Sequence, residues 1–547
     1  MENGQQNRET EDTRQKTGNT LDSTPAGASG MTALLAPYLP FSARMKILVT
    51  GGTGVVGTGT VTELLRRGHE VVLVSRHADD EVRQWPAGVI AHQADVGDAA
   101  SLAGSAEGCD AVLHVTGIVE EAPPEATFAR VNVGGTRNMI LEAERAGVRR
   151  FVYVSSLGAD RGASDYHRSK CEGERLARAF RGAWTICRPG NVYGPGDEQI
   201  SVLLRMVRSP SPVVPKIGDG DQPFQPLWWE DAAVSLADVV EREDLGGREL
   251  DIAGVEVTSQ NDLLQRFNVI IGRDVRSIAL PEVVATLGAK LISLVGWDVG
   301  FTDDQLQMLR EGNVIAPGAI NALTDVLRIT PTSLDAGLRA LCDQQPEQLP
   351  SDGVGTLKRK RFWADIDDCR YSPDVLFRMF TEHFNEVTPV FVEARAEPGD
   401  AGVFAEGETL TLALPMRGHV QVRVTGLEAR RVTLLTLAGH PLAGAVRFLT
   451  EQRGAAVRFQ VEVYDRAANV IDLVAMRTLG DRMQGHTWSH VVEKMVELSG
   501  GLAREGAQDV SESLDEDEAA AISHWLEELI VQRKRRENTE RIAAGVD

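Results

Sequence analysis

Short apolar runs alternate with helical stretches in the first third of the chain. The runs cover residues 47–49, 71–74, 111–115, 151–154 and 185–187. Continuous apolar runs between helices indicate strands that are buried on both faces, so the pattern predicts a parallel, doubly wound α/β sheet (a Rossmann-type fold). From about 195 to 345 the pattern loosens, and Gly and Pro become more frequent. This part is expected to form a small lobe at the C-terminal edge of the sheet.

The pattern changes after residue 356. Residues 420–424, 432–437, 457–463 and 470–476 are predicted to form successive antiparallel strands, and a helix is expected at 488–498. Strands followed by a helix indicate an α+β domain. A last helix is expected at 515–541, because acidic residues lie at its start and basic residues near its end, as the helix dipole prefers. Its apolar stripe could dock on the chain itself or on a partner, and docking on the chain itself is the favoured expectation. The stripe consists of Ile522, Trp525, Leu526, Leu529 and Ile530.

These patterns divide the 547 residues into five parts. Residues 1–44 are expected to be a disordered tail, because Leu21 is the only large aliphatic residue between Met1 and residue 30. The α/β domain and its lobe span 45–345, a linker spans 346–356, the α+β domain spans 357–505, and the final helix lies within 506–547. The most apolar run, 283–299, is shorter than the ~20 residues that a membrane-spanning helix needs, so we expect a helix of the lobe. An interfacial membrane contact there stays open as an alternative.

Composition narrows the function classes. Asp and Glu total 79 against 57 Lys and Arg, a formal net charge of −22, which argues against a general nucleic-acid binder. The five cysteines form no C-x-x-C pair, so we expect reduced thiols in a cytoplasmic protein, with neither a disulfide framework nor a metal site.

A glycine-rich loop follows the first predicted strand and opens a helix. Its sequence, residues 50–57, is TGGTGVVG. Gly51 allows a tight turn, Gly54 lets the backbone approach a pyrophosphate, and Gly57 lets the helix pack on the strand. The pyrophosphate of a dinucleotide would then lie on the helix N-terminus, where free N–H groups favour anions. Thr53, Val55 and Val56 complete the predicted loop contacts.

The ends of the next strands supply further cofactor contacts. The second strand ends at Ser75 and Arg76, where a reader of the ribose 2′-hydroxyl would be Asp or Glu. Because Arg suits a 2′-phosphate, NADP(H) is favoured, and NAD(H) stays open. Additional contacts are predicted after the third and fourth strands, at Asp95, Val96, Thr116 and Gly117.

Three residues form a candidate catalytic group. Ser156 follows the fifth strand, and Tyr166 and Lys170 come shortly after it. Residues four apart share one face of a helix, so the phenol and the ammonium are expected to project together. The ammonium should lower the pKa of the phenol. Tyr166 would then pass a proton to or from the substrate, Ser156 would orient the substrate, and Lys170 would also hold the nicotinamide ribose.

With this loop and this triad, the chain resembles the short-chain dehydrogenase/reductase superfamily, in its extended or atypical branch. Asn132, in the segment VNVGGT, matches a helix of that family, and the segment CRPGNVYG at 187–194 matches the one that borders nicotinamide and substrate. The resemblance implies cofactor contacts from Asn132, Pro189 and Gly190 and a substrate contact from Asn191. The loop before Tyr166 lacks the Tyr-Gly step usual in sugar-nucleotide epimerases, which weakens that assignment.

Longer stretches suggest a closer relative. SSLGAD at 155–160, SKCEGE at 169–174, FQPLWWED at 224–231 and FTDDQL at 301–306 resemble the nucleotide-binding accessory-subunit family of NADH:ubiquinone oxidoreductase. That resemblance implies bound NADPH and a quinone or respiratory association. In the C-terminal part, LAGHP at 437–441 and the order of elements resemble a helix-grip (START or polyketide-cyclase-like) domain. Such a domain implies an apolar cavity between sheet and helix.

The sequence thus leaves three functions open. The main hypothesis is an NAD(P)-dependent oxidoreductase of a hydrophobic carbonyl, alcohol or quinone-like compound. The alternatives are a non-catalytic NADPH-binding subunit or sensor with respiratory or lipid partners, and an NAD-dependent epimerase or dehydratase. The expected partner is a small hydrophobic substrate or a lipid, with no nucleic acid, while a peripheral membrane or respiratory-complex contact and the oligomeric state stay open.

Overall fold

A computed structural model of the chain describes residues 44–280, 307, 311–388, 393–394, 397–398, 404–414, 417–475 and 481–544. The expected tail, the apolar run at 283–299 and the FTDDQL segment lie wholly or almost wholly outside these residues. Within the described part of the chain, no helix combines the length and the apolar composition that crossing a bilayer requires.

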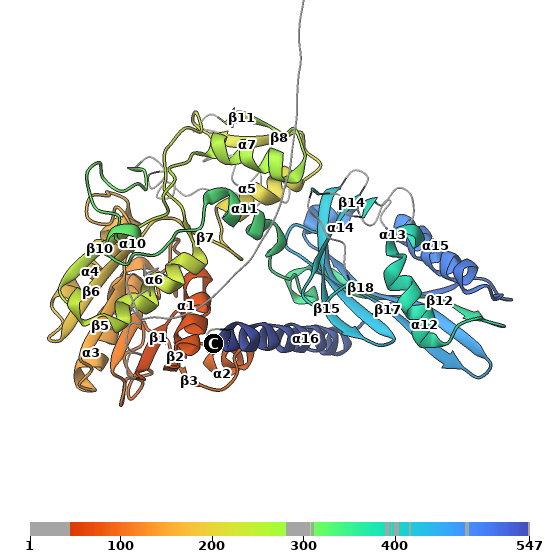
Figure 1. The fold of residues 1–547 in the computed structure, drawn as a ribbon, viewed down its shortest axis with the longest axis horizontal. Helices are drawn as coiled ribbons and strands as arrows, with labels where there is room; N and C mark the ends of the chain where they lie inside the picture. The colour runs from red at the N-terminus through yellow and green to blue at the C-terminus, as the bar shows by residue number, and fades with distance from the viewer. Residues whose placement is uncertain are drawn as a thin grey trace, which may run out of the picture. The chain divides into compact units, whose positions relative to one another are not determined.

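The first domain is built on a seven-stranded sheet in which every neighbouring pair is parallel, as predicted (Figure 1). The strand order is β10-β6-β5-β4-β1-β2-β3. The strands are β1 (Lys46–Thr50), β2 (Glu70–Ser75), β3 (Val89–Gln93), β4 (Ala111–His114), β5 (Arg150–Val154), β6 (Ala183–Pro189) and β10 (Arg248–Ile252). All five apolar runs that the sequence analysis singled out lie in these strands or overlap them.

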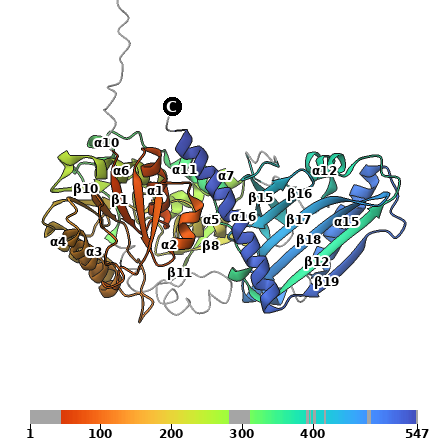
Figure 2. The same ribbon diagram turned by 90° about the horizontal axis from the view of Figure 1, so that it is seen from below.

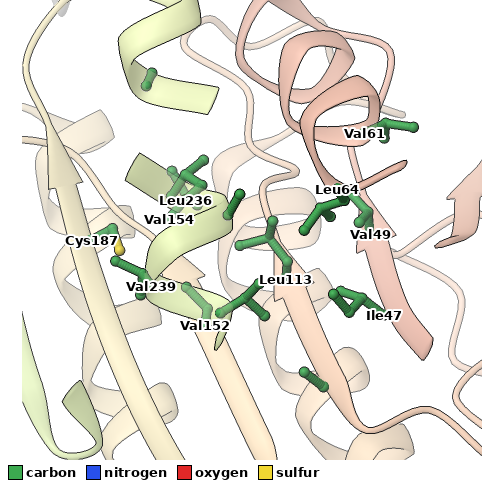
Figure 3. Close-up of a cluster of buried hydrophobic side chains, with 14 of the residues drawn as sticks. Ile47, Val49, Val61, Leu64, Leu113, Val152, Val154, Cys187, Leu236 and Val239 are labelled. Carbon is green, nitrogen blue, oxygen red and sulfur yellow. The ribbon is translucent and has the colours of Figure 1, made fainter. Parts of the chain in front are cut away.

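Helices cover both faces of this sheet because alternate strand residues point to opposite sides. On one face, Ile47 and Val49 pack with α1 (Val55–Arg66) and α6 (Trp229–Glu241) (Figure 3). On the other, Leu48 packs with α3 (Thr136–Arg145) and α4 (Asp165–Arg178). Shorter helical segments complete this domain: α2 (Ala78–Glu81), η1 (Val82–Gln84), η2 (Ala129–Gly135), η3 (Glu243–Leu245) and α10 (Ala322–Asp325).

A small lobe follows β6. It contains α5 (Ile200–Arg208), α7 (Gln260–Ile271) and α11 (Leu334–Asp343), which share one hydrophobic core. Two short parallel pairs complete it: β8 (Val213–Ile217) with β11 (Arg276–Leu280), and β7 (Val192–Tyr193) with β9 (Leu227–Trp228).

The C-terminal domain is a separate antiparallel sheet of eight strands, in the order β13-β14-β15-β16-β17-β18-β12-β19 (Figure 2). The strands are β12 (Val354–Ile366), β13 (Glu393–Ala394), β14 (Thr409–Leu414), β15 (Gly418–Glu428), β16 (Arg431–Thr436), β17 (Leu442–Arg453), β18 (Ala456–Ala467) and β19 (Gln508–Ser513). On one face lie α12 (Pro373–Glu382), α13 (Phe384–Val387) and α15 (Asp481–Ser499), over a core of aromatic rings that includes Phe380, Phe448 and Phe459. The turn η5 (Pro350–Asp352) precedes β12.

One predicted strand is wrong. Residues 470–475 form the helix α14 (Val470–Ala475). Asn469 starts this helix, because its side-chain oxygen accepts hydrogen bonds from the amides of Ile471 and Asp472, both at 3.0 Å. A polar side chain that caps the first turn favours a helix over an extended strand.

The final helix, α16 (Glu516–Ala543), lies against the other face of the antiparallel sheet. Leu526 and Ile530 pack there against Leu435 and Ala445, so the apolar stripe docks on its own chain as expected. Further along, the helix reaches the first domain, where Asn538 contacts α1 and η1.

Candidate active site

The carboxyl ends of the parallel strands meet at one edge of the sheet. The order of strands reverses between β1 and its neighbours, since β1 pairs with β2 on one side and with β4 on the other. In open parallel sheets, ligands bind outside the carboxyl ends of the strands at such a switch point. The predicted cofactor residues follow β1, β2, β3 and β4, so the fold brings them to this edge.

The glycine loop has the close packing that the sequence analysis expects. Gly51 has a φ of +67°, and a Cβ there would lie 2.9 Å from the Thr116 amide nitrogen. A Cβ on Gly57 would lie 2.0 Å from the Gly51 carbonyl oxygen. Gly54 is exposed, and a Cβ added there would lie 3.8 Å from its nearest neighbour, the Gly51 carbonyl oxygen, so this side of the loop is open. Among the residues that the structure describes, no side chain caps the first turn of α1, whose amides can therefore serve an anion.

These observations fit a dinucleotide. The loop is a cradle that side chains at Gly51 and Gly57 would disrupt, and its open face presents the start of α1. Thr53, Val55 and Val56 are half-buried in the same loop. A bound pyrophosphate would be held by main-chain N–H groups there.

At the end of β2, Ser75 is half-buried and Arg76 is exposed. The Ser75 hydroxyl donates a hydrogen bond to the carboxylate of Glu81, which also accepts one from the Thr53 hydroxyl at 3.3 Å. Glu81 was not among the predicted site residues, because it lies six positions after Ser75 and only the folding of α2 brings it back.

Asp95 is held by two partners after β3. Its carboxylate accepts hydrogen bonds from the Gly97 amide at 2.8 Å and from Arg130 Nη2 at 2.6 Å. Burial acts to raise the pKa of Asp95, but these two partners outweigh it and lower the pKa. Val96 is buried against Gly135, where an added Cβ would approach it to 2.8 Å.

After β4, Thr116 and Gly117 lie close to the residues that carry chemistry. The Thr116 amide donates to the Thr50 hydroxyl at 3.3 Å, and a Cβ on Gly117 would lie 3.0 Å from Lys170 Nζ. Asn132, on η2, is buried and its side chain bonds both main-chain groups of Ile118. It also donates to the Ser169 hydroxyl at 2.9 Å, which links η2 to α4.

The structure brings Ser156, Tyr166 and Lys170 together. The helix α4 carries Tyr166 and Lys170 one turn apart, and its first turn is capped by the Ser164 hydroxyl. Ser156 hydrogen-bonds the Tyr166 side chain. Lys170 Nζ donates to the Val154 carbonyl oxygen at 2.8 Å and lies 5.0 Å from the centre of the Tyr153 ring.

The electrostatics differ from the sequence-based expectation. Burial raises the pKa of Tyr166, and the Ser156 hydrogen bond only partly offsets it. Burial also lowers the pKa of Lys170 to about 8, against the opposing effect of Glu174. The expected lowering of the Tyr166 pKa is therefore wrong for this structure, because both groups are withdrawn from water and burial disfavours the charged form of each.

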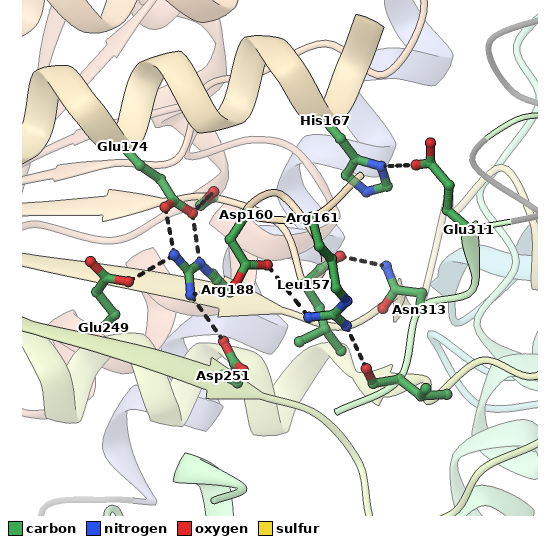
Figure 4. A network of polar contacts seen from close by, with 12 residues as sticks. Leu157, Asp160, Arg161, His167, Glu174, Arg188, Glu249, Asp251, Glu311 and Asn313 are labelled. Carbon is green, nitrogen blue, oxygen red and sulfur yellow. Dashed lines mark hydrogen bonds and ion pairs between the residues drawn. The ribbon is translucent and has the colours of Figure 1, made fainter. Parts of the chain in front are cut away.

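A buried network of charged residues joins α4 to β6, and it was not predicted from the sequence. Glu174 is fully buried, and accepts hydrogen bonds from the Ser155 hydroxyl at 2.7 Å and from Arg188 at 2.7 and 2.6 Å (Figure 4). Glu249 and Asp251 approach the same guanidinium. The only sequence signal was spacing: Glu174 lies four residues after Lys170, on the same helix face.

A second set of contacts fixes the position of the loop between Ser156 and Tyr166. His167 Nδ1 contacts the carboxylate of Glu311, which also accepts from the amides of Ala163 and Ser164 (Figure 4). Asn313 donates to the Leu157 carbonyl oxygen at 3.2 Å. The segment at 311–313 thus holds the loop that carries the predicted Ser156 and Tyr166.

The predicted residues at the end of β6 and just after it come next along the chain, and Pro189 contacts this loop. The Pro189 carbonyl oxygen accepts from the Leu157 amide at 2.8 Å, and the Gly190 amide donates to the Ile252 carbonyl oxygen at 2.8 Å. A Cβ on Gly190 would lie 2.4 Å from the Gln225 carbonyl oxygen. The Asn191 side chain donates to Gln199 at 2.6 Å.

Comparison with protein families gives a match in the first domain. A family described as the NAD dependent epimerase/dehydratase family matches residues 47–253. Ceramide reductase of Caulobacter vibrioides is 32% identical over 252 residues, which cover 45% of this chain and 77% of that protein.

Two further relatives match over a shorter part. A 3 beta-hydroxysteroid dehydrogenase/Delta 5-->4-isomerase of Mycobacterium tuberculosis is 33% identical over 189 residues, covering 28% of this chain and 48% of the relative. Sterol demethylase protein B of Methylococcus capsulatus is 34% identical over 185 residues, covering 30% and 56%. The chain thus spans about half the length of these two relatives.

Among solved structures, a UDP-glucose 4-epimerase of Thermotoga maritima is similar with a TM-score of 0.45 and 19% identity, over 55% of this chain and 97% of that one. A UDP-glucuronic acid 4-epimerase of Bacillus cereus is similar with a TM-score of 0.44 and 20% identity, over 55% and 98%.

Proposed function

Since the chain belongs to the NAD-dependent epimerase/dehydratase family, we propose that it is an NADP(H)-dependent oxidoreductase that reduces the carbonyl group of a large apolar molecule. The observation that carries the proposal is the group of Ser156, Tyr166 and Lys170 beside the glycine loop. The names of three relatives, which refer to ceramide, a 3 beta-hydroxysteroid and a sterol, support an apolar, lipid-like substrate.

In this proposal each residue has one task. The Tyr166 hydroxyl donates its proton to the carbonyl oxygen of the substrate, and its raised pKa keeps that proton in place at neutral pH. Ser156, which bonds the same phenol, orients the substrate oxygen. Lys170 places a positive charge next to the reacting groups. The bound cofactor supplies the hydride.

The preference for NADP(H) rests on Arg76. Its guanidinium is exposed at the end of β2, where a 2′-phosphate would accept hydrogen bonds from it. We expect Arg76→Ala to weaken binding of NADPH by about 10-fold and to leave binding of NADH within about twofold, since charge-assisted hydrogen bonds to phosphate are strong. Fluorescence titration with each cofactor measures both values.

The test of the activity is oxidation of NADPH with a panel of apolar ketones, which includes a 3-oxosteroid and an oxidised ceramide, beside a nucleoside-diphosphate sugar. We expect turnover with an apolar ketone, and a loss of about 100-fold or more in Tyr166→Phe with unchanged NADPH affinity. Tyr464→Phe removes the same hydroxyl in the C-terminal sheet and serves as the control.

The opposite results point to the alternatives. Equal turnover in Tyr166→Phe would remove the role of the phenol. Tight NADPH binding without hydride transfer to any ketone would favour the non-catalytic subunit with lipid or respiratory partners. Turnover of the nucleotide sugar alone would favour the epimerase or dehydratase.

For the C-terminal domain, we propose the helix-grip type on the grounds of the sequence resemblance. The support is an antiparallel sheet whose one face is covered by the 19-residue helix α15. We also propose a reducing, cytoplasmic setting, because all five cysteines are free thiols.

A further inference from the structure

Glu81 occupies a corner between the glycine loop and the end of β2. It is the last residue of α2 and is half-buried. One carboxylate oxygen accepts from the Thr53 hydroxyl at 3.3 Å, and the other accepts from the Ser75 hydroxyl. The Ser75 oxygen in turn accepts from the His77 amide at 3.1 Å. A single carboxylate therefore connects the loop that would hold the pyrophosphate with the strand end that would face the adenosine ribose.

The 2′ group of the adenosine ribose, in which NAD and NADP differ, would lie at this corner. In doubly wound folds, an acidic residue near the end of β2 bonds the ribose 2′-hydroxyl of NAD, whereas a nearby Arg accommodates the 2′-phosphate of NADP. The chain places Ser75 and Arg76 at the strand end itself. The folding of α2 then returns a carboxylate to the same place, so both kinds of reader are present.

The other charged groups of the corner have partners of their own. Asp95 is paired with Arg130. Arg83, two residues after Glu81, is paired with Glu528 of α16. Arg76 is exposed. Burial acts to raise the pKa of Asp95, and Gly97 and Arg130 lower it; the charge of Arg76 adds a smaller lowering effect. The hydroxyls of Thr53 and Ser75 are thus bonded to Glu81, and Arg76 is the exposed cation beside them.

We infer that Glu81 is a specificity-determining residue that opposes Arg76 in the choice between NADP(H) and NAD(H). Its carboxylate occupies the hydroxyls of Thr53 and Ser75, which a 2′-phosphate would need, and it carries the same sign of charge as that phosphate. Binding of NADP(H) therefore requires the Glu81 carboxylate to move away from Thr53 and Ser75. The 2′-hydroxyl of NAD(H) can instead donate a hydrogen bond to Glu81 without such a movement. The inference rests on the proposed function, because it concerns the cofactor of that same site.

The test is the binding of NADPH and NADH to the full chain, measured by fluorescence titration and calorimetry at one salt concentration. Glu81→Gln keeps the size of the side chain and removes its charge. We expect the Kd for NADPH to fall about fivefold or more and the Kd for NADH to stay the same or rise, because both cofactors carry the pyrophosphate but only NADPH carries the 2′-phosphate that the native carboxylate repels. Adenosine 2′-phosphate, compared with adenosine 5′-phosphate, should show the same difference without nicotinamide.

Asp79→Asn is the matched control, because Asp79 is exposed on the same short helix and carries the same charge. It should change neither Kd by more than about twofold, since exposed charges are screened by salt. The thermal midpoint of each variant shows that both remain folded.

Three outcomes contradict the inference. In the first, Glu81→Gln changes the Kd for NADPH and the Kd for NADH equally. In the second, Asp79→Asn changes these Kd values as much as Glu81→Gln does. Either result would be an effect of net charge and would overturn the role of Glu81 while leaving the proposed function in place. A wild-type protein that binds neither cofactor would overturn the proposed function and this inference with it.

Discussion

Gly54 and Gly57 of the phosphate loop are required for different physical reasons, although both are glycines of the same sequence motif. An added Cβ at Gly57 would meet the Gly51 carbonyl oxygen at 2.0 Å, so Gly57 is required by packing. Gly54 is exposed, and the nearest described atom to a Cβ there would be 3.8 Å away, so packing does not require glycine here, whereas the close approach of a bound pyrophosphate would.

We therefore expect Gly54→Ala to keep the thermal midpoint within about 2 °C and to weaken NADPH binding by about 10-fold or more, because the methyl group would face the pyrophosphate of a bound cofactor. Gly57→Ala should lower the midpoint itself. Differential scanning calorimetry and NADPH titration on both variants make the comparison. A Gly54→Ala protein with native affinity would show that the pyrophosphate does not approach this loop.

The sequence predicted Ser156, Tyr166 and Lys170 because their spacing along the chain is itself the signal. Glu174, His167 and Glu81 were missed for a physical reason. Their partners are Arg188, Glu311 and Thr53, which lie 14, 144 and 28 residues away and meet them only in the folded chain. The pKa of Tyr166 was predicted with the wrong sign because burial, which spacing does not reveal, raises it, and the Ser156 hydrogen bond offsets this only in part.

Among the elements, the parallel strands were the easiest to predict and β12 was the hardest. β12 contains the run Lys358-Arg359-Lys360-Arg361, which hides the alternation of a strand. Each of the last three basic residues has an acidic partner: Arg359 and Arg361 with Glu512, and Lys360 with Asp465. Pairing with two neighbouring strands thus allows a basic segment to lie inside a sheet.

Glu347 joins two elements through a buried ion pair. Its carboxylate binds Arg423 of β15 at 2.8 Å and Arg533 of α16. Burial acts to raise its pKa, but the two guanidinium groups outweigh burial and lower the pKa to about 2. A carboxyl group whose pKa falls on folding stabilises the protein above its unfolded pKa, and this contribution is lost as the pH falls through the folded value.

We expect Glu347→Gln to lower the free energy of unfolding at pH 7 by about 3–5 kcal/mol, because two buried guanidinium groups lose their counter-charge. The difference from the wild type should shrink as the pH falls from about 5 to about 2, because the carboxyl group of the unfolded chain takes up a proton in this range while the native one still resists it. Urea unfolding at several pH values measures it.

Glu537→Gln is the control, since Glu537 binds Arg533 from a half-exposed position. It should cost less than about 1 kcal/mol. A difference for Glu347→Gln that stays constant down to pH 2 would show that the charge of this carboxylate does not carry the effect.

At the scale of the whole molecule, two groups of contacts among the described residues connect the α/β domain and its lobe to the antiparallel sheet and its helix α16. In one, buried Arg208 of α5 pairs with Glu397 and donates to Gln421 of β15 at 2.6 Å. In the other, Asn538 of α16 donates to the Gln84 carbonyl oxygen at 2.8 Å and accepts from Thr62 of α1 at 3.4 Å. The helix α1 begins at the phosphate loop, so α16 packs on the element that would bind the cofactor.

We therefore expect the α/β and antiparallel domains to unfold in one calorimetric transition, and NADPH to raise its midpoint as a whole. A ligand at about 100 times its Kd adds about 2.7 kcal/mol to the folded state. Asn538→Ala combined with Arg208→Ala should separate the transition into two, of which NADPH raises only one. Two transitions in the wild type would contradict this coupling.

The position of α16 also has an evolutionary consequence. The helix is the last element that the structure describes, yet it covers the outer face of one domain and touches the back of the other. A gene fusion or recombination that exchanged only the strands of the antiparallel sheet would leave this helix without its matching surface. Descendants of this architecture should therefore inherit the sheet and its closing helix together, and a new α/β partner would have to supply the groups that Thr62 and Gln84 offer to Asn538 here.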